Sequence, residues 1–269
     1  MTVYDTIGVG YAQFRRSDPR IAGRIHAALG DAATVVNVGA GPGSYEPLDR
    51  WVVAVEPSLT MIQQRSLGAP SAVRAIAEDL PFADEAFDAA MALLTVHHWP
   101  DARCGLAELR RVTKGPVVVF TFDHAVHDHQ WLVAEYLPAM AELDADVPSP
   151  TDIAAALGGA IVEVVPIPRD CVDGFCHAWW QRPAAYLDPK VRASISGIAR
   201  LPEAIVSEAM DRLKQDLETG AWQERHADLS RLDEHDGGLR LVVSEPDKGQ
   251  FFAVSRCARD YDRRDGNHC

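Results

Sequence analysis

A glycine-rich segment followed by an acidic residue is the pattern in this sequence that predicts the most chemistry. The apolar run 34–38 leads directly into Gly39, Gly41 and Gly43, and a second apolar run ends at Glu56. Glycine lets a backbone turn tightly and approach a ligand closely. In an open α/β sheet, ligands bind at the carboxyl ends of the strands. The pattern therefore predicts a nucleotide-type site in which the Glu56 carboxylate accepts both hydroxyls of a ribose.

The spacing of the glycines separates two classes of nucleotide site. A dinucleotide-binding loop needs its third glycine at the position that Ser44 occupies, counting from Gly39. Gly43 comes one residue too early for that pattern. The loop therefore disfavours a nicotinamide-dependent dehydrogenase.

The elements around the loop indicate an α/β fold. Short apolar runs alternate with helical stretches, as in a parallel sheet buried on both faces. We expect strands at 34–38, 51–55, 72–76, 87–93, 116–122, 160–167 and 239–243. We expect helices at 18–29, where Asp18 is the N-cap and Gly30 the stop, and at 58–65, 101–111, 130–144, 152–157 and 202–218.

The same pattern predicts the division of the chain. We expect an N-terminal cap segment at 1–33, a core at 34–168 and 236–256, a helical substrate cap inserted at 169–235, and a tail at 257–269. An insert of that size between two strands of a sheet is more typical of a lid than of a linker.

Composition limits the partners. The chain has 269 residues and a formal net charge of −13, which disfavours binding to nucleic acid or to anionic lipid. No apolar run approaches the roughly 20 residues of a membrane-spanning helix. Five scattered cysteines and an N-terminus without a secretory pattern favour the cytoplasm. We expect a monomer or a homodimer.

Further segments carry a resemblance to a known family. Residues 77–82 (AEDLPF), 87–90 (FDAA), 93–99 (LLTVHHW) and 108–116 (ELRRVTKGP) follow the glycine loop in order. Together they resemble the class I S-adenosylmethionine-dependent methyltransferases, in particular the small-molecule, type 11-like group. The resemblance implies a Rossmann-like fold with a seven-stranded, mostly parallel sheet whose last strand is antiparallel. It also implies S-adenosylmethionine as methyl donor and S-adenosylhomocysteine as product.

The resemblance assigns cofactor residues as well. It implies that the three loop glycines lie beside the methionine part and that Glu56 binds the ribose. It places Ala77, Glu78 and Asp79 around the adenine, and Leu94 in the same site. Two positions depart from the family. Asn37 and Ile76 stand where aspartate is common, which puts their roles at the two ends of the cofactor in question.

Four residues are candidates for action on the acceptor. His97 and His98 end the fourth strand, near the expected methyl group, and a histidine suits a general base near neutral pH. We prefer His98; alternatively both are structural or line the cofactor. Asp123 orients a histidine, holds a substrate amine, or caps a helix. Tyr11 faces the sulfonium through cation–π attraction, touches the acceptor, or packs in the N-terminal segment.

Aromatic side chains in the insert and in the 130–144 helix suggest a wall for a flat acceptor, although a helical cap also needs a core of its own. The candidates are Trp131, Trp179, Trp180 and Tyr186. We therefore expect methylation of a small, aromatic molecule. The insert also resembles natural-product methyltransferases, including those that methylate an indole carbon of tryptophan-derived cyclic dipeptides. The alternatives are an O- or N-methyltransferase of a phenol or amine, and a non-catalytic protein that binds S-adenosylmethionine or another nucleotide.

No metal is expected. His124, His127 and His129 form one cluster with Asp128. Cys171, Cys176 and His177 form a second one. Neither cluster has the spacing of a strong ligand pattern, so a solvated loop and ordinary thiols are the preferred interpretations.

Overall fold

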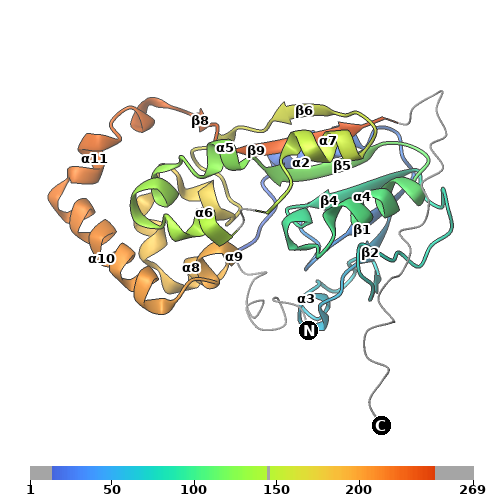
Figure 1. The fold of residues 1–269 in the computed structure, drawn as a ribbon, viewed down its shortest axis with the longest axis horizontal. Coiled ribbons are helices and arrows are strands. Elements are labelled where there is room, and N and C mark those ends of the chain that lie inside the picture. The colour runs from blue at the N-terminus through green and yellow to red at the C-terminus, as the bar shows by residue number, and fades with distance from the viewer. Residues whose placement is uncertain (1–13, 144–145, 246–269) are drawn as a thin grey trace, which may run out of the picture.

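The molecule is built on a seven-stranded sheet with the order β3-β2-β1-β4-β5-β9-β6 (Figure 1). The structure, a computed structural model, describes residues 14–143 and 146–245. The strands are β1 (Thr34–Val38), β2 (Trp51–Val55), β3 (Ala72–Val73), β4 (Ala89–Leu93), β5 (Val117–Phe122), β6 (Ile161–Val164) and β9 (Leu239–Ser244). The first five run parallel, whereas β9 pairs antiparallel with both β5 and β6. This confirms the Rossmann-like α/β sheet with an antiparallel last strand.

The strands are short and apolar because helices cover both faces of the sheet. Side chains alternate between the faces along each strand. Val35 and Phe120 pack on the side of α2 (Pro19–Ala28) and the cap. Val36 and Val119 pack on the opposite side, against α4 (Ala102–Arg111) and α7 (Pro150–Ala156).

Local capping determines where these helices start. Asp18 accepts a hydrogen bond from the Arg20 N–H at the beginning of α2, and Gly30 follows its end with a positive φ of 56°. Asp101 caps α4 through the Cys104 N–H. These side chains satisfy backbone donors that the first turn of a helix leaves unpaired. The predicted start and stop of α2 are confirmed.

The remaining helical elements form a lobe beside the carboxyl ends of the strands, on the left in Figure 1. Short helices α3 (Leu59–Ile62) and α5 (His124–His127) and the turn η2 (Val96–His98) lie at the sheet. The lobe contains η3 (Leu132–Tyr136), α6 (Ala139–Leu143), η4 (Cys176–Trp179), η5 (Pro183–Leu187), α8 (Pro189–Ala193), α9 (Ser196–Ala199), α10 (Glu203–Thr219), α11 (Ala221–Arg225) and η6 (Leu229–Arg231). A two-stranded ribbon, β7 (Ile167–Pro168) with β8 (Glu234–His235), closes the base of the insert.

Several predicted bounds are wrong for identifiable reasons. The helix expected at 130–144 is split into a π-helical turn, η3, and α6, because Pro138 cannot donate a backbone hydrogen bond and disfavours helical geometry at Leu137. The strand expected at 160–167 is split into β6 and β7, which belong to different sheets. The helix expected at 58–65 is a single short turn at Leu59–Ile62, and β3 stops at Val73.

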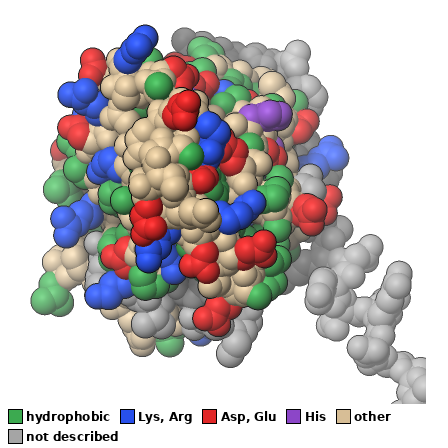
Figure 2. Space-filling model, turned by 90° about the vertical axis from the view of Figure 1, so that its left-hand side faces the viewer, with side chains coloured by type: hydrophobic (Ala, Val, Ile, Leu, Met, Phe, Trp, Pro, Cys, Tyr) green, Lys and Arg blue, Asp and Glu red, His purple; other side chains and the backbone are tan. Residues whose placement is uncertain are grey.

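The surface of the lobe mixes charges of both signs. Figure 2 shows acidic and basic side chains interspersed on this face. Within the described residues, no helix is long and apolar enough to cross a membrane.

Candidate functional site

A cavity of about 450 Å³ opens at the carboxyl ends of β1, β2 and β4. It brings together most of the predicted cofactor residues and both histidines that follow β4. Of the predicted residues, its lining includes Gly39, Gly41, Glu56, Ala77, Glu78, Leu94, His97 and His98. Gly43 and Asp79 are adjacent in sequence to this lining but are not part of it.

The glycine loop needs glycine for two separate reasons. Gly39 has a φ of 70°, and a Cβ there would overlap the side chain of Thr95 at the end of β4. Gly41 has a φ of 53°, and its Cβ would lie 3.3 Å from the Met61 methyl group. L-residues rarely adopt this left-handed region. The loop therefore lies tightly against β4 and α3, with its backbone forming the wall of the cavity.

Glu56 holds this loop from the end of β2. Its Oε2 accepts a hydrogen bond from the Gly41 N–H at 2.8 Å, and its Oε1 accepts one from the Ser58 N–H at 2.8 Å. Glu56 is buried and lines the cavity. A carboxylate has about four acceptor positions, so these two bonds are compatible with contacts to ribose hydroxyls.

A buried ion pair that the sequence analysis missed supports the loop from behind. The Arg65 guanidinium donates to Glu46 Oε2 at 2.7 Å, and both side chains are buried. Arg65 also donates to the Gly41 carbonyl at 3.2 Å. The Asn37 amide donates to the other Glu46 oxygen at 2.9 Å. No motif links Glu46 with Arg65, because they are 19 residues apart in a loop and after a short helix.

The contacts of Asn37 explain why asparagine can replace the usual aspartate here, and they show whether the cavity fits the cofactor. Because its amide nitrogen must face the acceptor-only Glu46, its Oδ1 points elsewhere. That Oδ1 is buried without a partner among the described residues, and Asn37 lines the cavity. A buried acceptor of this kind suits a donor such as the amino group of a methionine moiety. Glu46 supplies the negative charge, and an aspartate at position 37 would place two carboxylates side by side.

The end of the cavity that the resemblance assigns to the adenine is largely apolar. Ala75, Ile76 and Ala77 line it, and Ile76 remains 51% exposed. The Glu78 carboxylate accepts a hydrogen bond from the Asp101 N–H at 3.1 Å, which ties this wall to the start of α4. Trp99 completes the wall. Apolar contact and backbone groups therefore dominate here, in line with the replacement of aspartate by Ile76.

A second, smaller cavity of about 70 Å³ adjoins the first on the cap side. Arg15, Leu94 and His97 line both cavities and so form their common wall. Leu94 has a φ of 52°, a strained conformation for a branched apolar residue. The other walls of the second cavity are mixed. Polar side chains of His127, Cys176, His177, Ser194 and Ser196 line it together with apolar ones of Phe122, Met140, Phe175, Ile195 and Leu239.

His97, rather than the preferred His98, is the histidine that reaches both cavities. Its Nδ1 is buried and makes no hydrogen bond to the residues that the structure describes. Burial, reinforced by the neighbouring His98, holds the pKa of His97 well below its usual value, so the imidazole is neutral near pH 7. The ring packs edge-on against Phe122, 4.9 Å between centroids.

Asp123 caps a helix, which is one of the three roles that the sequence allowed. Its carboxylate caps α5 through the Ala125 N–H at 3.1 Å and lies 3.5 Å from the Arg240 guanidinium. It is not part of the lining of either cavity. We therefore do not assign it to the chemistry. Tyr11 lies outside the described residues.

Three of the four aromatic residues expected at the acceptor wall are buried in the core of the cap instead, and Trp179 packs partly buried against that core. Trp131 donates to the Trp180 carbonyl at 2.9 Å, and Trp180 donates to the Ile167 carbonyl at 3.1 Å. The Tyr186 hydroxyl donates to the Cys176 carbonyl at 2.6 Å. The Arg182 guanidinium carbon lies 4.3 Å from the centroid of the Trp179 ring. Neither cavity is lined by any of the four. The expectation of an aromatic acceptor wall at these positions is thus corrected.

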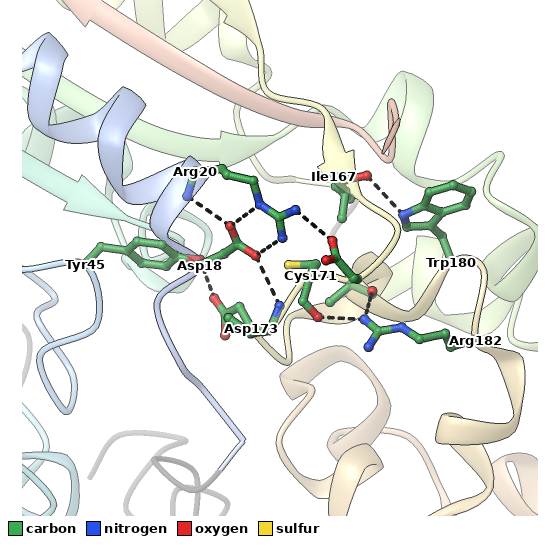
Figure 3. Close-up of polar contacts among 11 residues, drawn as sticks. Asp18, Arg20, Tyr45, Ile167, Cys171, Asp173, Trp180 and Arg182 are labelled. Atoms are coloured by element: carbon green, nitrogen blue, oxygen red, sulfur yellow. Dashed lines mark hydrogen bonds and ion pairs between the residues drawn. The ribbon is translucent and has the colours of Figure 1, made fainter. Parts of the chain in front are cut away.

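A buried carboxylate, Asp173, connects the cap with the site (Figure 3). It accepts a hydrogen bond from the Tyr45 hydroxyl at 2.7 Å and pairs with Arg15 at 2.8 Å. Tyr45 and Arg15 both line the larger cavity. Nearby, Asp18 accepts from the Val172 N–H at 3.2 Å. The start of the insert is therefore fixed to the residues that surround the cofactor cavity.

Comparisons with known proteins agree with this geometry. Residues 36–120 match the methyltransferase domain family, and they span β1 to β5 with the glycine loop and Glu56. The malonyl-[acyl-carrier protein] O-methyltransferase of Erwinia pyrifoliae is 36% identical over 103 residues, which are 36% of this chain and 39% of that protein. The chain thus matches about two fifths of the length of that curated relative.

Solved structures extend the similarity beyond the core. A protein of Anabaena variabilis described as a methyltransferase from an antibiotic biosynthesis pathway superposes with a TM-score of 0.81 and 28% identity, over 86% of this chain and 99% of that one. The [4+2]-cyclase SpnF shares the fold alone, with a TM-score of 0.50 and 14% identity over 91% and 95% of the two chains. The family match over residues 36–120, the antiparallel last strand and the loop–Glu56 geometry together support a class I S-adenosylmethionine-dependent methyltransferase.

Proposed function

We propose that the protein transfers a methyl group to a nitrogen, oxygen or sulfur atom of a small molecule, with His97 accepting the displaced proton. The observation that carries this proposal is the wall shared by the two cavities, in which His97 faces both. S-adenosylmethionine, when bound, supplies an electrophilic methyl group and leaves as S-adenosylhomocysteine. The chain's own residues then have to bind, align and deprotonate the acceptor.

Positioning is the first task. The glycine loop, Glu56 and Asn37 would hold the donor on the sheet, and the smaller cavity would hold the acceptor in line with it. Alignment of two reactants in this manner can supply about 7–11 kcal/mol of the barrier. Arg15, held by its ion pair with Asp173, forms one side of the shared wall.

Proton removal is the second task. A neutral imidazole with one ring nitrogen lacking a partner can take a proton from a hydroxyl, amine or thiol. The polar side chains in the lining of the smaller cavity support such an acceptor, because its histidines, Cys176 and serines offer hydrogen bonds to a polar group. The pathway of the Anabaena variabilis protein makes a natural-product acceptor a reasonable first choice for screening.

The test compares His97→Gln with His98→Gln in a methyl-transfer assay. Purified enzyme, S-adenosylmethionine and panels of phenols, amines, thiols and indoles would be analysed by mass spectrometry for the gain of one methylene unit. We expect products from protic heteroatom acceptors, loss of turnover in His97→Gln and retention in His98→Gln. Methylation of indole carbon alone, or unchanged turnover in His97→Gln, would contradict the proposal.

The second candidate is a role without methyl transfer. It is suggested by SpnF, which shares this fold and is named for a cyclisation. Binding of S-adenosylmethionine without any methylated product across all four acceptor panels would support this alternative.

A further inference from the structure

Residues from two separate histidine and cysteine clusters of the sequence lie together in the smaller cavity. His127 ends α5, whereas Cys176 and His177 begin η4 in the insert, about 50 residues later. One ring nitrogen of each histidine and the Cys176 sulfur lie within 4.8 Å of one another. All three residues line the smaller cavity. The sequence spacing of neither cluster predicts a metal site, because the three residues come together only through folding of the cap onto the core.

His127 is oriented by a carboxylate. Its Nδ1 lies 3.0 Å from Asp128 Oδ1, which leaves Nε2 as the nitrogen available for coordination. Its ring is also fixed by packing, 4.8 Å from Phe122 and 4.4 Å from the His177 ring between centroids. A carboxylate on the far nitrogen of a histidine is a common support for a metal-binding imidazole.

His177 provides the independent observation. The side chain is 4% exposed, and its Nε2 is buried without a hydrogen-bond partner in the described part of the chain. Leaving a buried polar atom unpaired destabilises the folded state. The imidazole packs against the His127 ring, 4.4 Å between centroids, and a Cβ on Gly237 would lie only 3.2 Å from the His177 Cβ. The atom is therefore fixed at the cavity and lacks a partner that a ligand would supply.

We propose that His127, Cys176 and His177 bind a zinc ion whose remaining coordination position faces the smaller cavity. Two imidazoles and a thiol are ligands that zinc prefers, and three protein ligands with an open position are typical of zinc sites that take water or a substrate atom. Cys176 carries a thiol and is not part of a disulfide. The site does not depend on the proposed methyl transfer, since zinc binding can be measured without any acceptor.

A neighbouring set, His124, His127 and Asp128, also brings its ligand atoms within 4.8 Å. It is the weaker candidate, because the Asp128 carboxylate already accepts hydrogen bonds from both histidines and its side chain is 26% exposed. It shares His127 with the proposed site, so the two sets can be told apart only by variants at the other positions.

The test uses the full chain, stripped with a chelator and then given one metal at a time. Zinc content would be measured by mass spectrometry after removal of loose ions, and cobalt would be added as a spectroscopic probe. We expect one zinc per wild-type chain and a near-ultraviolet thiolate-to-cobalt charge-transfer band. Cys176→Ser should abolish the band, and His177→Ala should lower zinc affinity at least tenfold. Asp128→Asn should lower it roughly 10–100-fold.

Matched controls make the result decisive. His124→Gln and Cys171→Ala should keep both the zinc and the cobalt band. Cys171 is a suitable cysteine control because it lies outside the cluster and burial raises the pKa of its thiol to about 12. Thermal unfolding of the metal-free variants would show that each is folded. A folded wild-type chain without zinc, a cobalt band that survives Cys176→Ser, or zinc lost only in His124→Gln would overturn the proposal.

Discussion

The Glu56 carboxylate accepts a hydrogen bond from the Gly41 N–H at 2.8 Å, so the end of β2 directly shapes the glycine loop at the end of β1. These two strands are neighbours in the sheet, and each ends at the same edge. A residue 15 positions away in sequence therefore controls the backbone that forms the cavity wall. The predicted cofactor site rests on this relationship more than on any single glycine.

Replacement of Glu56 by glutamine should weaken S-adenosylmethionine binding by roughly 10–100-fold. The amide would present N–H groups to the Gly41 or Ser58 N–H, and hydrogen bonds to a charged group are worth about 1.5–3 kcal/mol. Isothermal titration measures the change in Kd. Glu163→Gln, on the exposed strand β6, is the matched control. Equal affinities for the two variants would remove Glu56 from the cofactor site.

Replacement of His97, the histidine that lines both cavities, should lower turnover without weakening cofactor binding. His97→Gln should lower kcat by about 10²–10⁴-fold, the usual contribution of a general base, while the Kd for S-adenosylmethionine changes little. His98→Gln should keep kcat within a few-fold of the wild type. Steady-state kinetics on the acceptor found in the screen, combined with titration of the cofactor, gives both quantities. A kcat that depends on His98 instead would reverse the assignment.

Stability at acidic pH should depend on Asp18. Burial alone would raise the pKa of this carboxyl, but hydrogen bonds from Arg20 and from the Val172 N–H lower it to about 2, from an ordinary 3.8. A depressed pKa stabilises the folded state fully above about pH 4, and that stabilisation is lost as the pH falls towards 2. The shift corresponds to about 2 kcal/mol for this fully buried group.

Urea unfolding at pH 7 and pH 3 tests this dependence. Asp18→Asn should be less stable than the wild type by about 2 kcal/mol at pH 7, with a smaller deficit at pH 3. Asp170→Asn, which removes an exposed partner of the same Arg20, should change the unfolding free energy by less than about 1 kcal/mol. If the Asp18 deficit is the same at both pH values, its ionisation does not contribute.

Trp180 should behave as a core residue of the cap. It is 1% exposed, and its indole N–H donates to the Ile167 carbonyl at the base of the insert. Trp180→Ala should lower the unfolding free energy by roughly 3–5 kcal/mol. The KM for the acceptor should stay near the wild-type value in the fraction that remains folded. A raised KM with unchanged stability would restore the aromatic acceptor wall.

The sequence predicted the parts of the fold that local patterns encode. The bounds of β1 and β2 were correct because each is a β-branched run between turn residues, and α2 was correct because Asp18 and Gly30 mark its ends. The break at Pro138 follows from the same local chemistry, but the apolar periodicity on both sides of it concealed it.

Long-range relationships could not be read from the sequence. The pairing of Glu46 with Arg65 and the meeting of His127 with His177 depend on how loops and the cap fold back on the sheet. Aromatic residues such as Trp131 were misplaced for a related reason, since composition does not distinguish the core of a lobe from the wall of a cavity. Which of the two adjacent histidines lines the smaller cavity likewise depends on the turn η2.

The most direct test of the account is isothermal titration of the wild-type protein with S-adenosylmethionine and S-adenosylhomocysteine, alongside Glu56→Gln. We predict that both ligands bind one site per chain and that the Glu56→Gln variant, while still folded, binds each at least tenfold more weakly. A folded wild-type protein that binds neither ligand, or a Glu56→Gln variant that binds both as well as the wild type, would contradict the central claim that this cavity is an S-adenosylmethionine site.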